Sequence, residues 1–303
     1  MRLGIVIPNQ VAWGGPEEIL RLAVAAEDAG MDSVWVADHI VMPAAFDSPY
    51  PMQELQPFDP EANETFFEPL VTLAFVAART TRVRLGTSII LPTLRHPAYT
   101  AKLVATLDNL SGGRVVLGVG AGWLREEFDA LGVPFERRGA LLDEHIAVLR
   151  ELWSSEVATF EGEHYRLPPV RSAPKPAQAS GPPIWIGGAS TAALRRVAAI
   201  ADGWQPMAVG PPELANLVPR LRELAREAGR DPADIDVCPR CDLAFGAPQV
   251  HKPNGVYGTP EEVVAGLGAY REAGCTELIL DLQPDDSLAG RLETLDQLAP
   301  LVR

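Results

Sequence analysis

The chain has little of what marks secreted, metal-binding or membrane proteins. Its three cysteines, Cys238, Cys241 and Cys275, are too few for a disulfide framework. Cys238 and Cys241 form a lone C-x-x-C, and no second pair supplies the other ligands of a zinc site, so we expect buried thiols and no metal. No run of about 18 apolar residues occurs, which argues against a transmembrane helix. The chain enters a predicted strand at once, without a signal-peptide pattern, and we expect a cytoplasmic protein.

Lysine is also scarce. The formal net charge is −14, and lysine occurs only at Lys102, Lys175 and Lys252. A free acidic surface repels nucleic acid and anionic membranes, so we expect neither as a partner. A small-molecule substrate is the expected partner instead.

Eight short apolar runs alternate with eight helical patterns. Such runs are typical of strands buried on both faces of a parallel sheet. Helix signals support the alternation, for example Pro16 in a first turn, Gly30 after a last turn, and Thr259 with Glu262 as a capping box. We expect strands at 3–8, 33–37, 85–92, 115–119, 184–188, 203–206, 236–245 and 277–282, the seventh interrupted by Pro239. We expect helices at 16–29, 67–80, 97–110, 138–153, 191–201, 212–228, from 259 onward, and at 288–302.

Eight strand–helix units without a repeat or linker predict an α/β fold with a single (β/α)8 TIM barrel over residues 1–303. Two proline-rich irregular segments, at about 40–63 and 154–183, are expected as insertions at the C-terminal face. An open doubly wound sheet is the alternative. Against it, no G-x-G-x-x-G follows the first strand, and the glycine-rich piece Gly118-x-Gly120-x-Gly122 follows the fourth.

Active sites of such barrels lie at the C-terminal ends of the strands. Asp38 and His39 directly follow the second predicted strand. An imidazole with a carboxylate beside it can pass a proton near neutral pH, so we take His39 and Asp38 as candidate catalytic residues. The alternative is that His39 bonds a loop carbonyl while Asp38 caps the turn.

Three other strand ends suggest a cofactor site. Gly187-Gly188-Ala189-Ser190 leads into a helix whose N–H groups can hold a phosphate, although a plain N-cap would look the same. Gly120-Ala121-Gly122 allows close approach of a flat ligand. Ser88-Ile89 places a hydroxyl near the end of a buried strand, which either serves a ligand or bonds neighbouring backbone. Together the two glycine-rich turns favour a phosphate-bearing aromatic cofactor.

Eight segments, in this order, resemble the bacterial luciferase-like monooxygenase superfamily, and in particular its F420-dependent oxidoreductases. Each segment alone is weakly diagnostic, but the ordered set spans most of the chain. The segments are Val36–His39, Gly86–Pro92, Arg95–Pro97, Ala105–Arg114, Leu117–Trp123, Glu126–Phe128, Ile184–Gly188 and Ala201–Trp204.

The resemblance implies a non-prolyl cis peptide, expected at Ser88–Ile89, that backs the ring of the deazaflavin F420. It implies hydride transfer between F420 C5 and a small organic substrate, with reduction of a C=C or C=N bond. It also implies a homodimer. By position, Asp38 and His39 correspond to the family's pair after the second strand, with His39 near the ring and the substrate. The residues that correspond to cofactor contacts are Ser88, Ile89, Gly120, Ala121, Gly122, Gly187, Gly188, Ala189 and Ser190.

Two alternatives stay open on the same resemblance. One is an FMN-dependent monooxygenase that uses reduced flavin and oxygen, and the other is a non-catalytic flavin-binding barrel. The chain departs from the sugar-phosphate dehydrogenases of the family, which carry a glutamate near the position of Trp123. This chain has Glu126 and Glu127 farther on. This departure argues against glucose-6-phosphate as the substrate and leaves His39 or water as the proton donor. Candidate contacts for the acidic F420 tail are Arg125, Arg137, Arg138 and Lys175.

Overall fold

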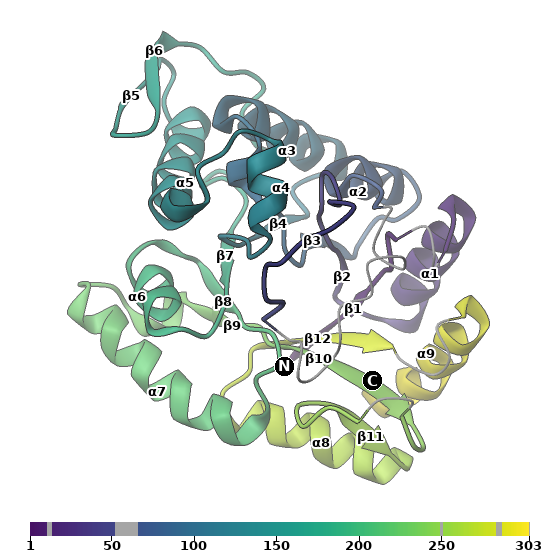
Figure 1. Ribbon diagram of the computed structural model, residues 1–303. Coiled ribbons are helices and arrows are strands. Elements are labelled where there is room, and N and C mark those ends of the chain that lie inside the picture. The colour runs from purple at the N-terminus through teal and green to yellow at the C-terminus, as the bar shows by residue number, and fades with distance from the viewer. Residues whose placement is uncertain (11–13, 52–65, 249–250, 283–286, 303) are drawn as a thin grey trace.

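A curled parallel sheet surrounded by helices forms the body of the molecule (Figure 1). The computed structural model describes residues 1–10, 14–51, 66–248, 251–282 and 287–302. The main sheet has ten strands in the order β11-β10-β12-β1-β2-β3-β4-β7-β8-β9, and every pair in it is parallel. The predicted α/β class with a parallel sheet is therefore confirmed.

The predicted alternation of strands and helices is found along the described chain. The strands of the main sheet are β1 (Arg2–Val6), β2 (Ser33–Val36), β3 (Arg84–Thr87), β4 (Val115–Val119), β7 (Ile184–Gly187), β8 (Gly203–Gln205), β9 (Asp236–Val237), β10 (Arg240–Phe245), β11 (Val256–Gly258) and β12 (Glu277–Leu282). The α-helices are α1 (Pro16–Ala29), α2 (Pro69–Ala77), α3 (Pro97–Ser111), α4 (Arg125–Ala130), α5 (Arg138–Ser154), α6 (Thr191–Ile200), α7 (Pro211–Glu227), α8 (Pro260–Glu272) and α9 (Leu288–Val302). None of the helices in the described part of the chain has the length and apolar character that a membrane span requires.

The seventh predicted strand is divided where proline interrupts it. Pro239 has no N–H to donate, and the run 236–245 forms two strands, β9 and β10, on either side of Cys238 and Pro239. β9 pairs with β8, whereas β10 pairs with β12. The two parts of this interrupted run therefore connect the β8 side of the sheet to the β12 side.

The third predicted strand is shorter than its apolar run. β3 ends at Thr87, and the peptide bond between Ser88 and Ile89 is cis, as the resemblance implied. Ile90 then forms an isolated parallel bridge with Val119 of β4. The prediction of a strand through residue 92 was wrong, because the chain leaves the regular ladder at Ser88.

The expected insertion at 154–183 contains secondary structure that the sequence did not predict. Strands β5 (Ala158–Glu161) and β6 (Arg166–Val170) form an antiparallel hairpin. Glu144 of α5 accepts three hydrogen bonds from its turn, from the N–H groups of Glu163, His164 and Tyr165 at 2.8–3.0 Å. The expected insertion at 40–63 lies partly outside the described residues.

Two stacked tryptophans fill the interior of the curled sheet. The rings of Trp35 on β2 and Trp185 on β7 have centroids 5.1 Å apart, and both residues are fully buried. Glycines on neighbouring strands make room for them. A Cβ at Gly86 would lie 2.1 Å from Trp35 Cε3, and a Cβ at Gly203 would lie 2.4 Å from Trp185 Cδ1. These close approaches explain why two strands carry glycine despite its weak strand propensity.

Substituting Gly86 with alanine is expected to destabilise the protein by about 1–3 kcal/mol, because the new methyl group overlaps the ring of Trp35. Urea unfolding followed by tryptophan fluorescence measures the effect. Gly268→Ala is the matched control: Gly268 lies in α8 with no atom within 4 Å of its Cβ position, and alanine favours helices. Equal stability of the native and Gly86→Ala proteins would contradict this account of the interior.

A buried histidine on α5 is expected to make the fold sensitive to acid. His145 is fully buried beside the ring of Tyr165, and neither of its ring nitrogens has a hydrogen-bond partner among the described residues. Burial, and then the charges of His96 and Arg95, lower the pKa of His145 to about 3. Between pH 6.5 and 3 the unfolded chain therefore binds a proton that the folded chain does not. Stability contributed by neutral His145 is complete above pH 6.5 and is lost as the pH falls.

Replacing His145 with phenylalanine is therefore expected to flatten this acid dependence. Between pH 6.5 and 5.0 the native protein should lose about 2 kcal/mol more unfolding free energy than His145→Phe. Urea unfolding at the two pH values measures the difference. His251→Phe, at an exposed histidine, is the control and should keep the native dependence. Parallel pH profiles for all three proteins would refute the assignment.

Candidate active site

His39 and a buried glutamate meet at the C-terminal edge of the sheet. His39 follows β2, and Glu127 comes from α4. His39 Nδ1 lies 2.8 Å from Glu127 Oε2. The other carboxylate oxygen accepts hydrogen bonds from the N–H groups of Ile40, at 2.7 Å, and Val41, at 3.3 Å. The Glu127 side chain is fully buried, so it holds both the imidazole and the start of the following loop.

Glu127 fixes which ring nitrogen of His39 carries the proton. An ionised carboxylate only accepts hydrogen bonds, so Nδ1 must donate. Nε2 is then the nitrogen that accepts a proton in the neutral ring and donates one in the charged ring. An imidazole oriented in this way by a carboxylate is suited to general acid–base catalysis.

Aromatic rings surround His39. Its ring centroid lies 5.1 Å from that of Phe66 and 6.4 Å from that of Trp123. Trp123 in turn contacts Phe46 at 5.8 Å and Tyr50 at 5.0 Å. The His39 side chain keeps 12% of its surface exposed, so it remains within reach of a ligand. These rings form an apolar setting for a proton-transferring group.

Asp38 does not pair with His39. Its Oδ2 accepts from Leu91 N at 2.9 Å and from Arg95 Nη1 at 2.7 Å, and its Oδ1 accepts from Arg95 Nη2 at 2.8 Å. The side chain is fully buried, and Arg95 is only 8% exposed. We therefore revise the predicted catalytic role of Asp38: it positions the segment that follows β3, and the carboxylate beside the imidazole belongs to Glu127.

Glu127 was not predicted as a site residue from the sequence. Its one signal there is a place in the segment Glu126–Phe128, which matches the family. Phe128 anchors α4 in an apolar cluster with Leu91 and Leu94, and this packing buries the neighbouring glutamate. His39 and Glu127 are 88 residues apart in the sequence, and their contact depends on how the six-residue helix α4 packs against the rest of the protein.

The predicted cofactor residues lie together at the ends of β3, β4 and β7. The Ile89 side chain connects them: a Cβ at Gly120 would lie 2.0 Å from Ile89 Cδ1, and a Cβ at Gly187 would lie 3.1 Å from it. Gly122 has a φ of 85°, and its carbonyl accepts a hydrogen bond from Arg138 Nε at 3.2 Å. The absence of side chains at these glycines thus lets the three turns converge.

The predicted contact region that begins at Gly187 continues into the start of α6. Ser190 is the N-cap, and its hydroxyl accepts a hydrogen bond from Ala193 N at 3.2 Å. Gly188 has a φ of 95° and, like Ser190, is exposed. Ala189 is partly buried against the core. Ser190 therefore acts as an ordinary N-cap of α6. The exposed turn at this helix N-terminus could bind an anion as well.

The buried side-chain amide of Gln205, at the C-terminal edge of the sheet, could pair with the polar edge of a bound heterocycle. Gln205 ends β8, is 4% exposed, and neither its Oε1 nor its Nε2 has a hydrogen-bond partner among the described residues. Its Oε1 faces Gly118, where a Cβ would lie 2.4 Å away. An unpaired buried amide costs about 1–3 kcal/mol, and the carbonyl and N–H edges of a heterocycle can pair with it. The residues present therefore fit a flavin-like ring.

The candidate contacts for an acidic tail are engaged elsewhere. Arg125 pairs with Glu136, and Arg137 pairs with Glu163. The Lys175 ammonium donates to carbonyl oxygens at 2.6 and 2.7 Å. Of these four candidates, Arg138 donates to a predicted site residue, through the carbonyl of Gly122.

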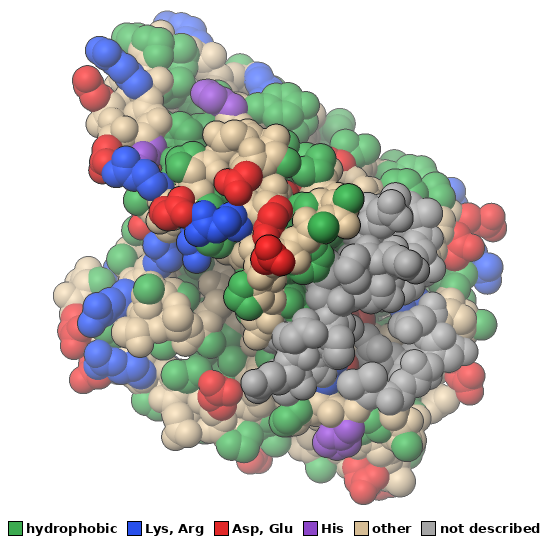
Figure 2. All heavy atoms as spheres, viewed as in Figure 1, with side chains coloured by type: hydrophobic (Ala, Val, Ile, Leu, Met, Phe, Trp, Pro, Cys, Tyr) green, Lys and Arg blue, Asp and Glu red, His purple; other side chains and the backbone are tan. Residues whose placement is uncertain are grey.

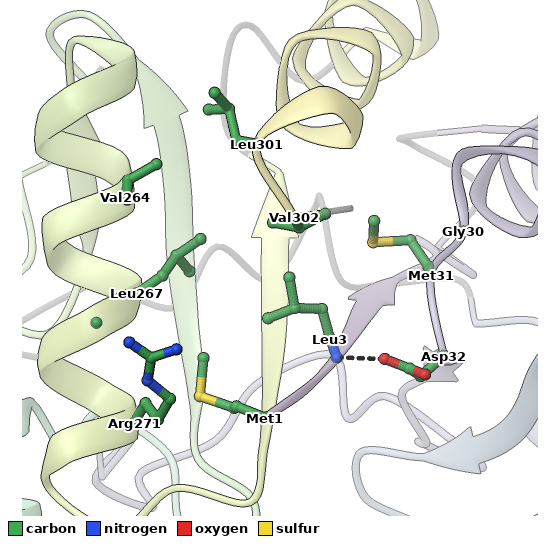
Figure 3. Close-up of a pocket in the computed structure, with 11 residues that line it drawn as sticks. Met1, Leu3, Gly30, Met31, Asp32, Val264, Leu267, Arg271, Leu301 and Val302 are labelled. Carbon is green, nitrogen blue, oxygen red and sulfur yellow. Dashed lines mark hydrogen bonds between the residues drawn. The ribbon is translucent and has the colours of Figure 1, made fainter.

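A cavity at the opposite end of the sheet contains none of the candidate site residues (Figure 3). It measures about 250 Å³ and lies between α8, α9 and the start of β1. Leu3, Leu267 and Val302 give it apolar walls, with Arg271 and Asp32 as its charged groups. The chemistry of His39 and Glu127 belongs to the C-terminal edge instead.

Enzymes built on parallel α/β barrels have their active sites at the C-terminal edge of the sheet, where this chain has an oriented histidine and converging glycine turns. Comparison with known families agrees. The model of the luciferase-like monooxygenase family matches residues 1–249. The chain belongs to this family.

Individual relatives refine the comparison. A protein of Mycobacterium tuberculosis, named only as uncharacterized, is 39% identical over 225 residues, which cover 72% of this chain and 75% of the relative. An F420-dependent glucose-6-phosphate dehydrogenase of Kineococcus radiotolerans is 30% identical, covering 95% of this chain and 94% of the relative. The solved structure of an F420-dependent secondary alcohol dehydrogenase, in complex with an F420-acetone adduct, has a TM-score of 0.81. It is 23% identical, covers 100% of this chain and 99% of that chain, and shows the likeness of fold.

Proposed function

We propose that this protein transfers a hydride between F420 and a small organic substrate, reducing a C=C or C=N bond. Membership of the luciferase-like family and the full-length relative named as an F420-dependent dehydrogenase indicate an F420-dependent oxidoreductase. The class of substrate and the kind of bond that is reduced are what this proposal adds, and experiments can test both.

The pair His39–Glu127 is the observation that carries the proposal. Hydride transfer to a double bond leaves an anionic atom that needs a proton, and an imidazole with Nδ1 held by a carboxylate can deliver it from Nε2. The rings of Phe66 and Trp123 beside His39 restrict access of water. His39 is therefore the proposed proton donor, and Glu127 is its positioning residue.

The three converging turns are the proposed cofactor site. Ser88, Ile89 and Gly120 to Gly122 would lie against the ring, while Gly187 to Ser190 would hold the phosphate at the start of α6. F420, when bound, supplies or accepts hydride at C5. The amide of Gln205 would bond a polar edge of the ring.

The wider architecture is part of the same proposal. When β9 and β10 are counted as one interrupted strand and the edge strand β11 is set aside, eight strands remain, and we propose that they form a closed (β/α)8 barrel. We propose one domain over residues 1–303, with the segments 40–63 and 154–183 as insertions. A cytoplasmic homodimer is the proposed assembly, which light scattering tests.

A titration with F420 and, separately, with FMN tests the cofactor assignment. The change in intrinsic tryptophan fluorescence reports binding, since Trp123 lies beside His39. Tight F420 binding and weak FMN binding are expected. The reverse order would move the protein to the oxygen-dependent flavin enzymes of the family, and binding of neither would refute the proposal.

A further inference from the structure

The cavity at the opposite end of the sheet is lined by one face of α8. The residues that this helix contributes, Val264, Leu267, Gly268 and Arg271, recur at the three- and four-residue spacing of a single helical face. No atom lies within 4 Å of the position that a Cβ would take at Gly268. Glycine in a helix interior costs about 1 kcal/mol relative to alanine. The missing side chain therefore keeps open a space that a larger residue would fill.

The inner walls of the cavity are apolar. Leu3 of β1, Met31 before β2 and Leu267 of α8 all line it, and each is less than 10% exposed. Leu301 and Val302, at the end of α9, add two further aliphatic side chains (Figure 3). A volume of about 250 Å³ between such walls suits the aliphatic part of a small molecule, because apolar surface gains free energy when it leaves water.

Two exposed side chains of opposite charge also line the cavity. Arg271 extends from α8 on one side, and Asp32 lies on the other, with Met1 and Leu3 between them (Figure 3). Asp32 Oδ2 accepts a hydrogen bond from Leu3 N at 2.8 Å. In the described part of the chain, neither Arg271 nor Asp32 takes part in an ion pair. The two charges therefore face the same space without cancelling each other.

Several other exposed arginines of this chain do have carboxylate partners. On the face that Figure 2 shows, several Lys and Arg side chains lie beside Asp or Glu side chains. Arg137 pairs with Glu163, and Arg171 pairs with Glu156. Charged groups that line a cavity without such partners are available to a ligand, and a guanidinium group binds a carboxylate through two parallel hydrogen bonds.

The two charges define the ligand. A carboxylate alone would gain Arg271 but meet the like charge of Asp32, and an ammonium group alone would meet the opposite mismatch. We propose that this cavity binds a small zwitterion, an α-amino acid with an aliphatic side chain such as leucine. Its carboxylate pairs with Arg271, its ammonium group with Asp32, and its side chain packs against Leu267 and Met31. This site lies apart from His39 and the cofactor turns, so it goes beyond the proposed function.

Four probes test the inference by isothermal titration calorimetry: L-leucine, 4-methylpentanoate, isopentylamine and glycine. The second lacks the ammonium group of leucine, the third lacks its carboxylate, and the fourth lacks its aliphatic body. The native protein should bind leucine at least about tenfold more tightly than each of the others, since each leaves a charge or the apolar walls unmatched. Leucine should also raise the temperature of unfolding, as a ligand of the folded state does.

Variants of the cavity place the binding. Gly268→Leu fills the space from α8 and should abolish leucine binding at unchanged or higher stability, because nothing lies within 4 Å of the new Cβ and leucine favours helices. Arg271→Gln and Asp32→Asn each remove one charge and should raise the Kd of leucine about tenfold. Asp32→Asn keeps an oxygen for the Leu3 N–H. Arg171→Gln, at an exposed arginine after β6, is the control and should leave the Kd unchanged.

The remaining outcomes overturn the inference at separate points. Equal binding of leucine and 4-methylpentanoate would leave Asp32 without a role and reject the zwitterion. Leucine binding that survives in Gly268→Leu would place the ligand elsewhere, and binding of none of the probes would reject the site. These measurements do not depend on F420. Failure of F420 to bind would therefore reject the proposed function and leave this inference to its own test.

Discussion

Replacing His39 with glutamine is expected to lower kcat for F420-dependent reduction by about 100-fold to 10,000-fold, the usual contribution of a general acid. The Kd for F420 should stay within about threefold of the native value, since a lost proton donor acts on the transition state and not on cofactor binding. Stopped-flow oxidation of reduced F420 measures the first quantity, and a fluorescence titration measures the second. A variant that retains more than about a tenth of native kcat would contradict the assignment.

Glu127→Gln tests the positioning role separately. Glutamine can occupy the same space but no longer fixes the proton on His39 Nδ1. A fall in kcat of about 10- to 100-fold is expected, smaller than for His39, together with a displaced pH profile of kcat. A purely structural role for Glu127 would lower stability and leave the shape of that profile unchanged.

The fold was largely predictable because its strands are buried on both faces. Such strands read as continuous apolar runs, and each of the eight predicted runs contains a parallel strand. The errors have local causes. The run after Thr87 leaves the ladder at Ser88, and the run around Pro239 is divided by a residue without an N–H. The hairpin β5–β6 depends on the carboxylate of Glu144, which no local pattern reveals.

The location of the candidate site was predictable from the sequence, but the hydrogen-bond partners of its side chains were not. The order of the strands placed His39, Ile89 and Gly120 at one edge, because parallel strands end together. Which carboxylate turns toward His39 depends on side-chain packing. Asp38 is adjacent in sequence, yet it points to Arg95, whereas Glu127 reaches the imidazole from another helix. Adjacency along the chain is a poor guide here, because successive side chains after a strand face different directions.

Asp38→Ala is expected to destabilise the protein by about 3–5 kcal/mol, since it leaves Arg95 with a buried and largely uncompensated charge. Glu68, the other partner of Arg95, is 37% exposed and replaces little of the loss. Urea unfolding measures the change. Glu156→Ala, at an exposed ion pair, is the control and should cost less than about 1 kcal/mol.

The same variant separates a positioning role from a catalytic one. Asp38 accepts the N–H of Leu91, which follows Ser88 and Ile89, so its loss should loosen that segment and raise the Kd for F420 by about tenfold. Asp38→Asn keeps an oxygen that can accept the Leu91 N–H and should recover most of this affinity. For both variants the pH profile of kcat should keep its native shape, because Asp38 is not the group that passes the proton. Loss of one limb of that profile at unchanged stability would return Asp38 to the catalytic residues.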